Sequence, residues 1–190
     1  ARQMEESASA LAAEGLDPAK LLRRTGGIIG REIRGKGSGG EERFRFLGSL
    51  TCKGPIWRFD TVDALCPRVY ELQDPYGLAW PMLERIRAAA KARGFAAVVC
   101  PDPEHPDRTQ HLLLPELGLA FVTSRDGMAY PGGACRRVRM ETMLVPDHLK
   151  RCKSRLRFIR RVAQALREEG LEALREAKSA HDALEALYHP

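Results

Sequence analysis

The sequence predicts an α/β fold in which an open, mostly parallel sheet is flanked by helices and followed by a C-terminal helical hairpin. The first observation is the apolar run FAAVVC at residues 95–100, which is typical of a strand buried on both faces of a parallel sheet. The second is the order strand, helix, strand, loop, strand between residues 68 and 123. The third is a pair of amphipathic segments after residue 146.

The α/β core is expected at residues 43–145. Its expected strands are residues 68–72, 95–100 and 117–123, and residues 111–114 form another short apolar run. A helix is expected at residues 82–92, because Leu83 and Ile86 share one face and Gly94 follows as a stop signal. Strands joined through such helices favour right-handed crossovers and therefore a parallel sheet.

Residues 1–42 are expected to be an N-terminal helical and linker segment. Helical character between residues 4 and 22 is interrupted at Gly15 and at Asp17-Pro18, where proline suits the first turn of a helix. Seven glycines lie among residues 26–40, which argues against a helix interior and for a flexible linker.

Within that linker, Gly30 to Gly37 reads G-x-x-x-x-G-K-G, one residue away from a Walker A motif. The motif needs Ser or Thr after the lysine to hold Mg²⁺, and it needs a buried strand before the loop. Neither feature is present, so we expect no nucleotide site in this segment.

Residues 146–190 are expected to form two helices packed on the core. Apolar residues recur every three or four positions on either side of Glu168-Glu169-Gly170, which is interpreted as the turn of the hairpin.

The composition is that of a globular protein. The chain has 190 residues, a net charge of +6 and five widely spaced cysteines without a C-x-x-C pair. Reduced thiols are therefore expected, and no metal site is predicted. No apolar run approaches the ~20 residues that a membrane span needs, and the first residues lack the apolar region of a signal peptide, so a cytoplasmic location is expected.

Basic residues gather in two places, and two interpretations remain open for them. The first cluster is Arg136, Arg137 and Arg139; the second is Lys150, Arg151, Lys153, Arg155, Arg157, Arg160 and Arg161. Each cluster is either a solvated face or a patch that contacts phosphates. Phe158 is the single aromatic residue within the second cluster, and no repeated aromatic spacing indicates base stacking.

Residues 70–86 have the layout of a phosphate-binding loop, because a strand, a glycine-containing turn and a helix start follow one another. Here the chain resembles an uncharacterised bacterial family of tandem P-loop ATPase-like proteins, which are built from two similar halves. The resemblance covers residues 43–188, and its order of motifs is similar to a C-terminal half. The matching segments are RFRFLGSLTCKGP at 43–55, CPDP at 100–103, LLPELGLA at 113–120 and AKSAHDALEALY at 177–188.

The departures from the family loop bear on its chemistry. Where the family has the Lys and Ser of its loop, this chain has Trp80 and Pro81, and Asp74 stands in place of a glycine. Thr123 takes the place of the acid after the Walker-B-like strand, and Met128 that of the histidine in the T-A-P-H motif. An indole and a proline supply neither the cation nor the Mg²⁺ ligand that a triphosphate needs.

The resemblance therefore implies a degenerate, non-hydrolysing P-loop domain that regulates or scaffolds an intact half of the same or another chain. ATP and Mg²⁺ are its ancestral ligands, and no cofactor is expected now. The degenerate loop comprises Asp74, Pro75, Tyr76, Gly77, Leu78, Ala79, Trp80 and Pro81. The alternatives are an ATPase with an atypical loop and a basic domain that contacts nucleic acid. Candidate anion contacts are Lys53, Arg136, Arg137, Arg139, Lys150, Arg151, Lys153 and Arg157.

Four further residues carry groups suited to chemistry. His105 and His111 flank an acidic loop, where a solvated loop is favoured over a metal site. His181 is interpreted as a structural histidine on a helix. Glu116, between two apolar runs, is a catalytic candidate only if its carboxylate is buried.

Overall fold

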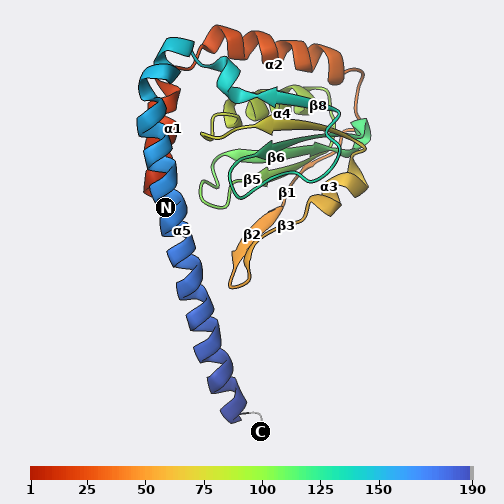
Figure 1. Ribbon diagram of the computed structural model, residues 1–190. Helices are drawn as coiled ribbons and strands as arrows, with labels where there is room; N and C mark the ends of the chain where they lie inside the picture. Colours follow the sequence, from red (N-terminus) through yellow and green to blue (C-terminus); the bar gives the residue numbers. More distant parts are fainter. Residues whose placement is uncertain (189–190) are drawn as a thin grey trace.

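A computed structural model describes residues 1–188 and confirms an α/β fold with a mostly parallel sheet of six strands (Figure 1). The strands follow the order β1-β5-β6-β7-β4-β8. Their bounds are β1 Glu42–Phe44, β4 Arg68–Gln73, β5 Ala97–Pro101, β6 Thr109–Leu114, β7 Leu119–Ser124 and β8 Arg136–Arg139. Strand β6 is antiparallel to both neighbours, and the other pairs are parallel.

Helices cover both faces of the sheet. Helices α2 (Pro18–Glu32) and α4 (Trp80–Ala92) bury Ile28 and Leu83 against one face. The short helix α3 (Phe59–Leu65) covers the other face together with the hairpin of β2 (Gly48–Thr51) and β3 (Gly54–Trp57). Short 3₁₀ turns, η1 (Pro115–Leu117) and η2 (Met140–Met143), follow β6 and β8. The predicted strands and the predicted helix before Gly94 are therefore all present.

The prediction that residues 26–30 cannot lie inside a helix is wrong. They belong to α2, which begins where the Asp17 side chain accepts a hydrogen bond of 2.9 Å from the Lys20 N–H. Glycine costs about 1 kcal/mol per position in a helix interior. Burial of Leu21 and Ile28 on the core-facing side of α2 outweighs that cost. Residues 35–40 remain outside regular structure.

The predicted C-terminal hairpin is also wrong, because α5 is one helix of 43 residues, Pro146–Tyr188. Gly170 lies inside it, between strong helix formers that carry the helix through the glycine. The first half of α5 packs against α1 (Arg2–Ala13) through Leu156 and Ile159. The second half extends away from the body, and the side chains of residues 172–188 are exposed (Figure 1).

None of the helices described within residues 1–188 combines the length and the apolar character that crossing a bilayer requires.

Candidate functional site

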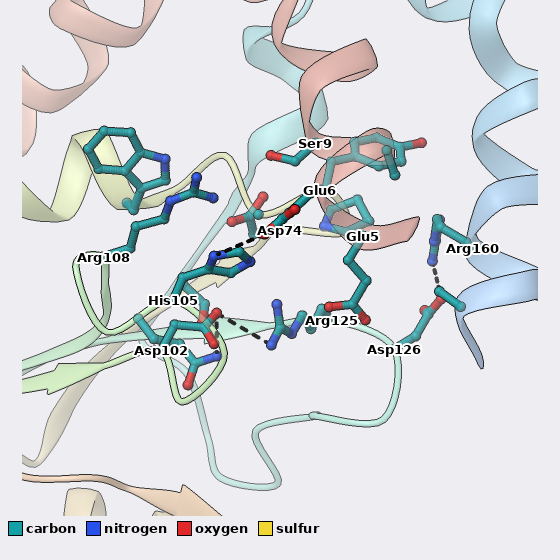
Figure 2. A pocket seen from close by; sticks show the side chains of 18 of the residues that line it. Glu5, Glu6, Ser9, Asp74, Asp102, His105, Arg108, Arg125, Asp126 and Arg160 are labelled. Atoms are coloured by element: carbon teal, nitrogen blue, oxygen red, sulfur yellow. Dashed lines mark hydrogen bonds and ion pairs between the residues drawn. The ribbon is translucent and has the colours of Figure 1, made fainter. Parts of the chain in front are cut away.

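The loop between β4 and α4 lies at the carboxyl edge of the sheet, where ligands of open α/β folds bind. A cavity of about 90 Å³ adjoins it. Its walls come from this loop, the β5–β6 loop, the end of β7 and the helices α1 and α5 (Figure 2). Segments far apart in the sequence therefore enclose one small space beside the predicted phosphate loop.

Asp74 binds the backbone of the loop that it begins. Its side chain is buried, and its two carboxylate oxygens accept hydrogen bonds from the Leu78 and Ala79 N–H groups, each at 2.7 Å. Burial raises the pKa of the Asp74 carboxyl, while these two hydrogen bonds and the charge of Arg125 act in the opposite direction. Gly77 takes a positive φ of 68°, which permits the tight turn.

The outer side of the loop is covered. Tyr76 and Leu78 lie in an apolar cluster with Ala8 of α1 and Ile159 of α5. The Tyr76 hydroxyl donates to Glu141 at 3.2 Å, which fixes the ring beneath α5. The two helices therefore stand over the loop instead of leaving it open to solvent.

Trp80 and Pro81 begin helix α4. The Trp80 indole is 38% exposed, and the Arg108 guanidinium lies 5.7 Å from its ring centroid. Pro81 occupies the first turn, where its missing N–H costs little because helix N-termini leave such donors unpaired. Trp80 and Pro81 therefore form the start of α4, and they supply neither a cation nor a hydroxyl there.

Charged side chains around the cavity pair with one another (Figure 2). The pairs are Glu5 with Arg167, Glu6 with His105 at 3.8 Å, Asp102 with Arg125 at 3.5 Å and Asp126 with Arg160. Two of these acids belong to α1, so this helix brings carboxylates to Arg167 of α5 and beside the His105 ring of the β5–β6 loop. The arginines that line the cavity therefore have their charges balanced by carboxylates of the same chain.

Two polar groups beneath the cavity have no hydrogen-bond partner among the described residues. They are the Thr123 hydroxyl and the His111 Nε2, both buried. The other ring nitrogen, His111 Nδ1, accepts a hydrogen bond from the Thr123 N–H at 3.1 Å. Burial and the charge of Arg125 lower the pKa of His111 to about 3, so the ring is neutral at physiological pH.

None of the eight predicted anion contacts lines the cavity. Lys53 lies exposed in the turn between β2 and β3. Lys150, Arg151, Lys153 and Arg157 are exposed on α5. Arg137 and Arg139 on β8 line a separate groove together with basic residues of α2, while Arg136 is exposed on the same strand. The basic residues of α2 were missed, although their helical spacing was visible, because the glycines indicated a linker.

The remaining candidates are structural or exposed. The Glu116 carboxylate is exposed and binds the Ala96 and Ser38 N–H groups at 2.7 and 3.0 Å, so it fixes the glycine-rich segment and does not meet the condition of burial. His181, Asp182 and Glu185 form the only metal-sized group of ligand atoms found within residues 1–188, and all three are exposed. All five cysteines are free.

No protein family, curated protein or solved structure matches this chain.

Proposed function

We propose that this chain is a non-hydrolysing P-loop-fold module that regulates or scaffolds an ATPase-like partner half. The observation that carries the proposal is the pair of 2.7 Å hydrogen bonds from the Leu78 and Ala79 N–H groups to Asp74. In a working phosphate loop, backbone N–H groups of this kind receive the nucleotide phosphates. Here a carboxylate of the same chain already satisfies them.

The groups that would stabilise a transferring phosphoryl group are replaced as well. Trp80 offers no ammonium, Pro81 offers no hydroxyl, and the Thr123 hydroxyl carries no charge for a metal ion. Each lost charge-assisted contact weakens binding by about 1.5–3 kcal/mol. The alternative of an ATPase with an atypical loop has less support, since none of the candidate cations from Lys53 to Arg157 lies at the cavity.

The packing of helices α1 and α5 over the loop supports a regulatory role. A nucleotide at the loop would have to displace the packing of Tyr76 against these helices and the ion pair between Glu5 and Arg167. The site is therefore held closed by the chain itself.

The exposed apolar residues in the second half of α5 support the proposal that the chain binds a partner. Leu174, Leu184 and Leu187 are exposed by 41%, 57% and 76% in the second half of α5, where all residues from 172 to 188 are exposed. An amphipathic helix without a covering surface is a common means of docking on another protein. We assign this segment to contact with the partner half.

Titration with Mg-ATP, followed by thermal unfolding and by phosphate release, tests the proposal. The wild type is expected to show neither a shift at millimolar ligand nor turnover, because a bound ligand must stabilise the fold by mass action. The triple variant Asp74→Gly, Trp80→Lys, Pro81→Ser restores the donors, the cation and the hydroxyl, and it is expected to gain a thermal shift.

The positive charge of the protein surface requires a control for non-specific binding of ATP. Basic surfaces bind ATP through its phosphates, but such binding collapses as salt rises. A saturable thermal shift of the wild type with Mg-ATP that persists at raised salt, or phosphate release by the wild type, would contradict the proposal.

A further inference from the structure

A groove of about 710 Å³ lies between helix α2 and the edge strand β8, and it is separate from the cavity beside the loop of Asp74. Figure 1 shows α2 running alongside β8 at the end of the sheet. Six basic side chains line the groove, and no acidic residue does. They are Lys20, Arg23, Arg24 and Arg31 from α2 and Arg137 and Arg139 from β8.

Most of these cations are not neutralised by the protein. Within residues 1–188, Arg137 alone forms an ion pair, with Glu71 at 2.8 Å, and the other five form none. All six are exposed. Like charges gathered in this way raise the local potential and attract a polyanion.

The arrangement follows from how α2 is built. The face with Leu21 and Ile28 is buried in the core, and the basic residues lie on an exposed flank of the helix beside that face. Lys20 and Arg31 are eleven positions apart, or about 16 Å along a helix at 1.5 Å per residue. Gly27 also lines the groove, and because it has no side chain it leaves the groove open at that position. The result is a row of cations with a shallow floor.

We propose that the groove between α2 and β8 binds the phosphate backbone of a nucleic-acid strand without reading its sequence. Five of the six cations are arginines, whose planar guanidinium groups match phosphate oxygens in a bidentate manner. Regularly spaced phosphates meet a row of cations along a helix. The lining contains no aromatic side chain on which a base could stack, so affinity comes from the backbone alone.

An acidic peptide fits the groove less well. A peptide that adds a strand to β8 needs pockets for alternate side chains. The apolar members of the lining, Val138 and Met143, are themselves buried and offer no such pocket. Arginine occupies three of the four positions of β8, and charged side chains on an edge strand oppose pairing with another strand.

Fluorescence anisotropy with labelled single-stranded homopolymer oligonucleotides tests the proposal on the full chain. Affinity is expected to be similar for different homopolymers. Because a single strand releases about 0.7 counterion per phosphate contact, the slope of log affinity against log salt is expected to reach about −4 if all six cations engage. The double variant Arg23→Ala, Arg24→Ala should lower affinity roughly tenfold per lost contact and reduce the slope by about 1.4.

The matched control is Arg155→Ala, Arg157→Ala, which removes the same charge from exposed positions of α5 outside the groove. It should leave affinity within about threefold of wild type, since screening weakens distant charges. Equal loss in both double variants, no loss in the groove variant, or tighter binding of polyglutamate than of the oligonucleotides would each overturn the proposal. Circular dichroism checks that both variants are folded.

Discussion

Four arginines surround the cavity at the carboxyl edge of the sheet, while five arginines and a lysine surround the groove between α2 and β8. At the carboxyl edge each arginine faces a carboxylate of the same chain. The pairs are Arg108 with Asp107, Arg125 with Asp102, Arg160 with Asp126 and Arg167 with Glu5. In the groove only Arg137 has such a partner among the described residues.

The difference separates two uses of positive charge. Partly buried pairs, such as Arg125 with Asp102, hold loops and helices in fixed positions around the cavity. Exposed cations without partners contribute little to the fold and remain available to a ligand. We therefore expect substitutions at the carboxyl edge to change stability and substitutions in the groove to change binding.

The largest effect is expected at Asp74. The substitution Asp74→Ala leaves the buried Leu78 and Ala79 N–H groups without an acceptor, and it should lower the free energy of unfolding by about 2–4 kcal/mol. Urea denaturation measures the loss. Asp126→Ala removes an exposed acid at the same edge and should cost less than about 1 kcal/mol. A variant at Asp74 as stable as wild type would mean that the carboxylate does not hold the loop.

A smaller effect for each pH unit is expected from acid, through His111. Its pKa is about 3 in the folded chain, against an ordinary value of 6.5 for a histidine, so between these values the unfolded chain binds the additional proton. The stabilisation from this group is complete above pH 6.5 and is lost as pH falls toward 3, by at most about 1.4 kcal/mol per pH unit. The conservative variant His111→Gln should flatten this part of the stability profile.

Urea denaturation at several pH values measures the free energy of unfolding as a function of pH. Arg139→Ala, which removes an exposed cation of the groove, should leave the shape of the profile unchanged. Profiles of equal slope for wild type and His111→Gln would show that the buried imidazole does not control acid stability.

The sequence predicted the parts of the fold that depend on local pattern. Strand β4, its loop, helix α4 and strand β5 follow one another in the chain, and their apolar periodicities identify them. The helical state of residues 26–30 was missed because it is stabilised by burial of Ile28 against the sheet. The helix propensities of the residues alone do not reveal such a tertiary contact. The continuity of α5 through Gly170 was missed because the glycine was interpreted as a turn, although one glycine between strong helix formers costs a helix only about 1 kcal/mol.

The candidate sites were predicted less well, because they depend on side-chain direction and on contacts between distant segments. The sequence presents Asp74 as a negative charge that repels phosphate. Only the structure shows its oxygens bound to the N–H groups of the loop. The groove joins Arg23 to Arg139, which are more than a hundred residues apart. No spacing rule along the chain places these two residues side by side.

The smallest effect on stability is expected in the second half of α5, another surface without an internal partner. The double variant Leu184→Glu, Leu187→Glu changes two exposed side chains on a helix that packs on nothing there. It should alter the free energy of unfolding by less than about 0.5 kcal/mol while abolishing association with the partner half. Leu156→Glu is the matched control, since Leu156 is 1% exposed and packs between α5 and α1. That substitution buries a charge without a partner and should unfold the chain at much lower urea. If the double variant lost as much stability as this control, the distal half of α5 would belong to the fold of the chain, and the partner surface would have to lie elsewhere.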